Sequence, residues 1–130
     1  MGLKPGMRAH LRNAPESAIS AIDPPELIVR DSLRGTFDYL HVFCTTTTEL
    51  DRIFPKLRDH LDRSGRLFVS WPKSGKLESD LSIKNVIRIG YSHGLVESTA
   101  LRIDDTWSAL KFTWPKAGKV YHNSYGRLPT

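Results

Sequence analysis

The sequence has a single cysteine, Cys44, among its 130 residues. No disulfide can form within the chain, which fits a reducing compartment. Long apolar runs are also lacking, and none approaches the roughly 20 residues that a membrane-spanning helix needs. The amino terminus carries Lys4 and Arg8 but has no apolar stretch typical of a signal peptide. These absences predict a cytoplasmic protein with no membrane partner.

Three kinds of site lack part of their pattern. The five histidines have no spacing typical of metal ligands. Residues 72–76 resemble a phosphate-binding loop, but the leading glycine is missing and Leu77 replaces the hydroxyl residue that binds Mg²⁺. Residues 90–94 match the G-x-S-x-G pattern of serine hydrolases, but a helical pattern precedes them and a strand pattern follows, the reverse of the required order. We therefore predict none of these sites.

Acidic residues are absent from the carboxyl end after Asp105, although the whole chain has 14 of them against 19 basic residues, for a net charge of +5. Elsewhere the two signs are interleaved, which is typical of a solvated surface. Aromatic and basic residues alternate in the acid-free segment, and a nucleic-acid contact there stays open. These residues are Lys111, Trp114, Lys116, Lys119, Tyr121, Tyr125 and Arg127.

The composition that is present, 39% hydrophobic and 25% charged, is that of a globular protein. The length leaves room for one domain. We expect a single α/β domain over residues 1–115. We expect the remainder, residues 116–130 (the tail), to be poorly ordered.

The middle of the chain predicts two parallel strands joined by a helix. Phe37–Cys44 and Arg66–Trp71 are rich in strand-forming residues, and the helical pattern between them makes a β-α-β unit. Cys44 ends the first of these strands, which favours a buried structural thiol over a nucleophile.

The connecting helix has recognisable boundaries in the sequence. Thr48 is its predicted N-cap, with Asp51 as the capping-box partner, and Gly65 is its predicted stop. Pro55 predicts either a kink or the start of a new turn. The apolar residues recur at helical spacing. They are Leu50, Ile53, Phe54, Leu57 and Leu61.

The second half predicts a loop over residues 72–79, a helix and a hairpin. Asp80 or Ser82 caps the helix, and Gly94 ends it. Leu95–Asp104 and Trp107–Trp114 are extended, and the short join between them predicts an antiparallel hairpin. One face of the helix is apolar, consisting of Ile83, Val86, Ile87 and Tyr91.

The first third of the chain is harder to interpret. Met7–Arg12 predicts a strand, Ser17–Ile22 a short helix and Leu27–Arg30 a second strand. Only residues 31–36 then remain before the strand at Phe37, whereas a parallel crossover normally needs about a dozen residues. Either a bare extended segment crosses the sheet or Leu27–Arg30 is not a parallel strand.

This order of elements, ending in an antiparallel hairpin, resembles the class I methyltransferase fold. Leu3–Arg8 resembles the approach to the first strand of that fold, and Leu61–Leu67 the approach to its fifth strand. Phe37 and Asp38 open what would be its fourth strand. The resemblance implies a three-layer, Rossmann-like α/β domain whose last strand is inserted antiparallel between its two predecessors. One strand and the helices around it are missing, so the domain resembles a truncated form.

The chain also resembles a small family of uncharacterised bacterial proteins with this truncated domain. The likeness extends over residues 3–114 and implies no activity. The matching segments are Lys4–Met7, Asn13–Pro15, Val69–Lys73, Gly94–Val96 and Ile103–Phe112.

The turn after the first strand reads Asn13-Ala14-Pro15, where cofactor-binding members of this fold have glycines. Glycine allows a close approach of the backbone and leaves free N–H groups, whereas Ala14 adds a Cβ and Pro15 removes a donor. We therefore expect no cofactor. In the alternative, S-adenosylmethionine is bound with Asn13 and with Asp31 as the acid that holds its ribose.

Ligands of open α/β sheets bind outside the carboxyl ends of the strands. Applied here, this rule selects a set of polar and aromatic residues as ligand-binding candidates. The candidates are Asn13, Asp31, Thr45, Trp71, Lys73, Asp104, Asp105 and Trp107. In the alternative interpretation, Trp71 and Trp107 belong to the core, and Asp104 and Asp105 only form a turn.

The preferred functional hypothesis is a non-catalytic, methyltransferase-like binding or regulatory module. Its partner would be a protein or a small anionic ligand at the rim formed by residues 71–73 and 104–107. The second hypothesis is a divergent methyltransferase that uses S-adenosylmethionine. The third is a nucleic-acid-binding module, based on the charge and the tail alone. No catalytic residue is assigned.

Overall fold

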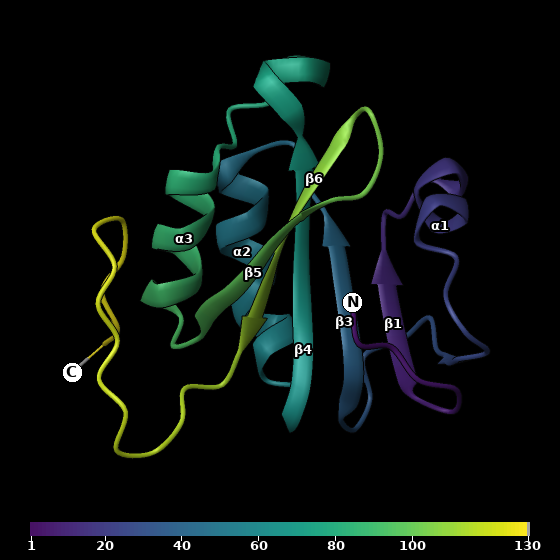
Figure 1. Cartoon of the computed structure of the whole chain (residues 1–130), viewed down its shortest axis with the longest axis horizontal. Coiled ribbons are helices and arrows are strands. Elements are labelled where there is room, and N and C mark those ends of the chain that lie inside the picture. Colours follow the sequence, from purple (N-terminus) through teal and green to yellow (C-terminus); the bar gives the residue numbers. More distant parts are fainter. Residues whose placement is uncertain (130) are drawn as a thin grey trace.

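The computed structural model describes residues 1–129, which form a six-stranded sheet with the strand order β2-β1-β3-β4-β6-β5 (Figure 1). β2, β1, β3 and β4 are parallel neighbours, whereas β6 runs antiparallel between β4 and β5. The mostly parallel sheet and the inserted last strand are as predicted. In chain order the elements are β1 (Arg8–Arg12), α1 (Glu16–Ile22), β2 (Ile28–Val29), β3 (Phe37–Phe43), α2 (Thr47–Arg58), β4 (Leu61–Pro72), the 3₁₀ segment η1 (Lys73–Glu78), α3 (Ile83–Ser92), β5 (Val96–Arg102) and β6 (Trp107–Thr113).

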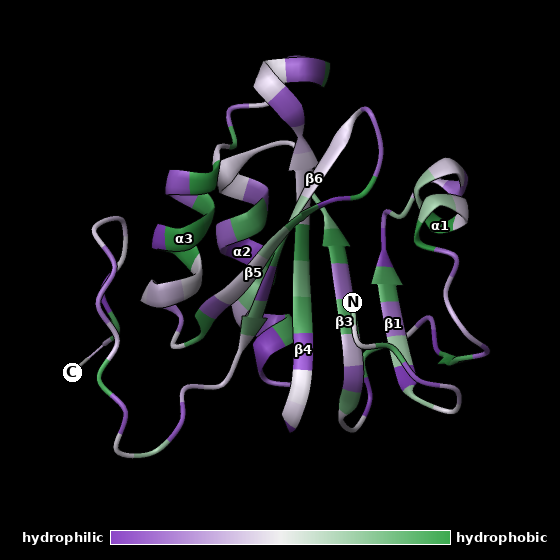
Figure 2. Cartoon of the chain, in the orientation of Figure 1, coloured by the Kyte–Doolittle hydropathy of each residue, from purple (hydrophilic) through white to green (hydrophobic). Residues whose placement is uncertain are grey.

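Helices cover both faces of the sheet, which gives the three predicted layers. On one face, α2 and α3 pack on the larger core cluster, to which neighbouring strands contribute Leu40, Val69 and Leu110. On the other face, α1 contributes Ala18 to a smaller cluster that includes Phe68. Figure 2 shows the middle of β4 as hydrophobic, and α3 as hydrophobic on the side toward the sheet and hydrophilic on the other. Alternate strand residues thus supply two cores.

The start of α2 differs from the prediction. Its N-cap is Thr46, whose hydroxyl accepts a hydrogen bond from the Glu49 N–H at 3.2 Å, and not Thr48 with Asp51. Four consecutive threonines offer equivalent caps, so tertiary contacts decide among them. Asp80 accepts hydrogen bonds from the N–H of Thr47 at 2.8 Å and from its hydroxyl at 3.1 Å, which fixes the first turn there.

The end of α2 was also predicted wrongly. The helix ends at Arg58, with Pro55 inside it, and β4 already begins at Leu61. Gly65 is a strand residue and not the helix stop. A Cβ at Gly65 would lie 2.9 Å from the Phe37 carbonyl oxygen. Glycine is therefore required by the close approach of two backbones.

The second half follows the prediction closely. Of the two candidate caps, Ser82 is the one used, in a reciprocal capping box with Asn85. β5 and β6 form the expected antiparallel hairpin. Ile83 is the exception on the apolar face of α3, because 42% of it is exposed. It is the first residue of the helix and extends past the edge of the core.

The short connection after β2 is a bare extended segment, the first of the two predicted alternatives. β2 has only two residues, which pair with Arg8 and Ala9 at the start of β1. Ala9 also pairs with Tyr39 near the start of β3. The chain therefore has little distance to return before β3 begins, and residues 30–36 pass β1 without a helix.

The described part of the tail runs beside α3 (Figure 1). Asn123 donates from Nδ2 to Glu97 Oε1 at 2.8 Å. Gly126 lies against Tyr91, where a Cβ would come within 2.8 Å of that side chain. The poor order expected for residues 116–130 in solution stays a prediction, and Thr130 lies outside the described residues.

Candidate functional site

The structure separates the eight candidate residues into groups. Asn13 lies at the end of β1, and Thr45 lies between β3 and α2. The Thr45 carbonyl accepts hydrogen bonds from the Ser79 hydroxyl at 2.7 Å and the Asp80 N–H at 3.2 Å, so it ties two loops together. Asp31 follows the short β2 and is exposed. The other five surround the ends of β4 and β5.

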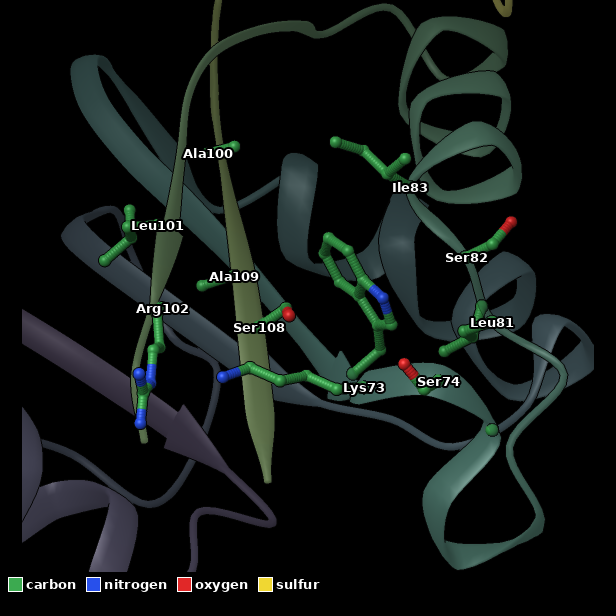
Figure 3. A pocket seen from close by; sticks show the side chains of 12 residues that line it. Lys73, Ser74, Leu81, Ser82, Ile83, Ala100, Leu101, Arg102, Ser108 and Ala109 are labelled. Atoms are coloured by element: carbon green, nitrogen blue, oxygen red, sulfur yellow. The ribbon is translucent and has the colours of Figure 1, made fainter. Parts of the chain in front are cut away.

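A cavity of about 630 Å³ lies where β4, β5 and the start of α3 meet (Figure 3). This size is within the range of small-molecule sites. Trp71 and Lys73 from the predicted set line it. Other residues that sequence analysis did not select also line it, and those used in the arguments below are Leu81, Ile83, Ala100, Arg102 and Ser108.

Two cationic side chains meet at one carbonyl oxygen beside the cavity. Lys73 donates from Nζ to the Asp104 carbonyl at 2.7 Å, and Arg102 donates from Nε to the same oxygen at 3.3 Å. Lys76 donates to the next carbonyl, that of Asp105, at 3.1 Å. The hairpin turn thus holds three cations close together, and a dense positive charge attracts anions.

The nearby carboxylates neutralise this charge only in part. Asp104 Oδ1 accepts from the N–H groups of Thr106 at 2.9 Å and Trp107 at 2.8 Å, which closes the turn. Asp105 pairs with Arg102, but the Asp105 side chain is 88% exposed. Exposed pairs contribute little and exchange readily with solvent. Asp104 therefore closes the hairpin turn, and whether it also binds a ligand stays a prediction.

Trp107 does not belong to the cavity, which corrects its place among the candidates. It is 8% exposed and belongs to the smaller core cluster on the opposite face of the sheet. Its ring meets that of Phe43 edge-on, with centroids 5.1 Å apart. Strand alternation explains the difference, because Trp107 and Ser108 project to opposite faces.

Trp71 belongs to the core, as the alternative interpretation predicted, and its role in ligand binding stays a prediction. It is 6% exposed and belongs to the larger core cluster, yet it lines the cavity. Trp114 donates its indole N–H to the Leu61 carbonyl at 3.1 Å. Within residues 1–129 the Trp71 N–H makes no such hydrogen bond, but it is not a fully buried atom, so water can satisfy it.

The turn after β1 does not fit S-adenosylmethionine. Asn13 is held at a φ of 60°, and Pro15, which has no N–H, is the N-cap of a helix of seven residues. Asp31 lies beside the middle of β1 and not at the rim, because the Arg30 N–H bonds to the Ala9 carbonyl. The free donors and the acid that would hold this cofactor are therefore not brought together.

Of the two other reactive side chains, Cys44 is buried, whereas Ser92, the serine of the hydrolase motif, is exposed. Burial raises the pKa of the Cys44 thiol, and Glu49 raises it further, which agrees with a structural thiol. Ser92 is the last residue of α3, and its hydroxyl donates to the Ile89 carbonyl at 2.7 Å, so the hydrolase motif lies at a helix end as expected. Residues 1–129 contain no group of acidic, Cys and His side chains placed to hold a metal ion. In the same range, no helix has the length and apolar character to cross a membrane.

Register could have revealed the missed lining residues. Arg102 pairs with Ser108 across the hairpin, directly beside the predicted turn. Placing the turn therefore places both side chains next to Trp71, which pairs with Ser108 from the other side. The exposure of Ile83 had no comparable signal, because its spacing matches the buried face of the helix.

No protein-family model matches the sequence, and no curated protein matches it. Solved structures match the fold. The ribosomal protein L11 methylase of Lactobacillus delbrueckii subsp. bulgaricus has a TM-score of 0.59 at 12% identity, over 88% of this chain and 73% of that chain. Magnesium protoporphyrin IX methyltransferase from Synechocystis PCC 6803, with bound SAH, has a TM-score of 0.56 at 14% identity, over 85% of this chain and 75% of that chain. A methyltransferase from Pyrococcus furiosus has a TM-score of 0.52 at 15% identity, over 85% of this chain and 76% of that chain.

These likenesses show the fold, at identities that carry no activity with them. The chain has the Rossmann-like α/β fold of class I methyltransferases, as its sequence predicted. The likeness is consistent with a truncated form of that fold, since this chain covers 73% of the L11 methylase chain and 75% of the magnesium protoporphyrin IX methyltransferase chain.

Proposed function

We propose that this protein is a non-catalytic binding module that holds a small anionic ligand at the ends of β4 and β5. The observation that carries the proposal is the cavity beside Lys73 and Arg102, two cations that share the Asp104 carbonyl. An anion entering the cavity would meet both groups without displacing a buried carboxylate. We also propose that the protein acts in the cytoplasm.

The first turn of the fold supports a non-catalytic role. A donor cofactor needs backbone N–H groups that point at it, and the segment from Asn13 to Pro15 supplies few. The cavity, in contrast, is separated from this turn by β3 and lies at the ends of β4, β6 and β5. Ligand binding at the cavity is therefore independent of the turn.

One observation favours a second candidate, a divergent methyltransferase. Neighbours of the same fold hold SAM or SAH in their own structures, and they match 85% of this chain. In this candidate, Asn13 and Asp31 bind S-adenosylmethionine. The acceptor would then lie in the cavity near Trp71.

Thermal unfolding of the full chain separates the two candidates. A ligand present at a hundred times its Kd adds about 2.7 kcal/mol of stability, which raises the Tm by several degrees. We expect no shift with S-adenosylmethionine or S-adenosylhomocysteine. We expect phosphate and citrate to raise the Tm more than chloride at equal ionic strength, and the Lys73→Met variant to lose this difference.

A matched pair of variants makes the result decisive. S-adenosylmethionine could raise the Tm of the wild type and of Lys73→Met but not that of Asp31→Asn. This result would establish the methyltransferase and overturn our proposal. Equal effects of all anions on wild type and Lys73→Met would overturn it as well. Asp31 is an exposed side chain, so its amide variant should fold normally.

Nucleic acid is not the partner that we propose. The aromatic rings of the basic carboxyl end are each approached by a cation. Arg63 lies 4.2 Å from the Trp114 ring centroid, and Lys119 lies 5.1 Å from that of Tyr121. Base stacking would have to displace these cations. Salt-dependent binding to mixed RNA and DNA tests this prediction.

A further inference from the structure

The cavity is divided into an apolar part and a cationic part. Leu81 and Ile83, at the start of α3, face Ala100 of β5 across it, and Trp71 lines it from β4. Figure 3 shows the Lys73 side chain extending away from Leu81 and Ile83, toward the side on which Arg102 lies. A ligand that fills both parts has an apolar body and an anionic end.

The indole of Trp71 gives the apolar part a hydrogen-bond donor. Trp71 is 6% exposed and lines the cavity from β4. An oxygen of a bound ligand within reach of the indole N–H would accept a hydrogen bond from it in place of water.

Exposed apolar surface around the opening supports the same division. Ile83 is 42% exposed at the cavity wall. An exposed apolar side chain is normal when it stands alone, but Ile83 lies beside a cavity that a tryptophan also lines, and ligand sites are lined mainly by apolar and aromatic side chains.

We infer that the ligand is a planar aromatic oxyanion, an aryl carboxylate or an aryl phosphate ester. Its ring contacts Trp71 and Ile83, and its oxyanion lies between Lys73 Nζ and the Arg102 guanidinium. A ring substituent oxygen accepts the Trp71 N–H. This inference rests on the proposed function, because it specifies the ligand of that same cavity.

Compounds matched in charge and size test the ring. Benzoate and cyclohexanecarboxylate carry the same charge, as do phenyl phosphate and cyclohexyl phosphate, but only the first of each pair is planar. Benzamide keeps the ring and removes the charge. We expect the aromatic anion of each pair to bind about two- to tenfold more tightly than its saturated partner, and benzamide to bind about tenfold more weakly than benzoate. The comparison of benzoate with phenyl phosphate then distinguishes carboxylate from phosphate.

Indole N–H resonances report where the compounds bind. The chain has three tryptophans, and a Trp71→Phe variant assigns the Trp71 signal by its loss. We expect benzoate or phenyl phosphate to shift the Trp71 signal and to leave the signals of Trp107 and Trp114 in place. Salicylate, which adds a ring oxygen, should shift the Trp71 signal further than benzoate.

Two variants and a control complete the test. Lys73→Met and Arg102→Met should each weaken binding by about tenfold or more, the effect of losing one charged hydrogen bond. Lys56→Met removes an exposed cation on α2 and should leave binding unchanged. All three positions are exposed or half-buried, so the variants should fold.

The outcomes separate this inference from the proposed function. If saturated and aromatic anions bind equally well and Lys73→Met weakens both, the module binds anions and the inference about the ring is wrong. If no anion in the panel shifts the Trp71 signal at millimolar concentration, both the inference about the aromatic ligand and the proposed function are overturned. A shift of Trp71 by benzamide equal to that by benzoate would show that the cations play no part.

Discussion

Acidification should destabilise this protein through one histidine, His41, which is fully buried in the middle of β3. Its Nδ1 lies 2.6 Å from the Tyr39 hydroxyl, and its Nε2 lies 2.7 Å from the Ser70 hydroxyl. Both partners are hydroxyl groups, which can donate or accept, so either neutral tautomer is satisfied. Neither partner carries a charge that would stabilise the imidazolium. Burial therefore lowers the pKa of His41 to about 3.

The sign of the effect follows from proton linkage. In the unfolded chain, a histidine has its ordinary pKa of about 6.5. Below that pH, the unfolded chain takes up a proton that the native protein does not, and the free energy of unfolding falls by about 1.4 kcal/mol per pH unit. The stability that neutral His41 provides is complete above pH 6.5 and is lost as the pH falls toward 3. From pH 7.5 to 5.0 the loss is about 2 kcal/mol.

Urea unfolding of the wild type and of His41→Gln measures the contribution of His41 to the free energy of unfolding at each pH. The variant should lose about 1–3 kcal/mol at pH 7.5, because two buried hydroxyls lose their partner. Its stability should then fall between pH 7.5 and 5.0 by about 2 kcal/mol less than that of wild type, since all other groups contribute equally to both chains. Parallel pH profiles would refute the reasoning. Should the variant not fold, the His41 ring resonances of the wild type, which should not titrate above pH 4.5, provide the same test.

Three further predictions concern packing, capping and reactivity. Gly90→Ala should destabilise the protein by about 2 kcal/mol or more in urea unfolding, since a Cβ there would lie 2.0 Å from the Phe112 ring. Thr46→Ala should cost about 1 kcal/mol by loss of the α2 cap, whereas Thr48→Ala should cost a few tenths, and equal costs would contradict the cap. Cys44, a buried thiol whose pKa is raised, should react with Ellman's reagent only when the protein unfolds, and rapid labelling of the native protein would show that it is accessible.

The fold was predictable because its signals are local and agree with one another. The helical spacing of α2 and α3, the strand-forming runs and the turn at Asp104 each follow from short segments, and together they leave few topologies. The errors lie at boundaries that tertiary contacts decide. Asp80, far along the chain, selects the first turn of α2, and the Phe37 backbone explains Gly65. No window of sequence around those positions contains this information.

The site was predictable only in part, for a different reason. The rule that ligands bind at the carboxyl ends of strands placed Trp71 and Lys73 beside the cavity, but it treated all strand ends alike. It could not separate Trp107, which projects to the other face, from Ser108, which lines the cavity. Nor could it show that Arg102 and Lys73 share a carbonyl, since that depends on hydrogen bonds made by the folded hairpin.

The short connection after β2 and the poor fit of the first turn to a cofactor have one geometric origin. Residues 30–36 can span at most about 25 Å, and they must pass β1 and return to the level of Phe37. β2 can therefore pair only with the start of β1, at Arg8 and Ala9. A longer β2, which would bring Asp31 to the rim, would need a longer return, and hence a crossover helix. Without such a helix Asp31 stays away from the rim, whereas the ends of β4 and β5, on the other side of the sheet, do not depend on this connection. The ligand site that we propose at Trp71 and Lys73 is therefore placed independently of the first turn.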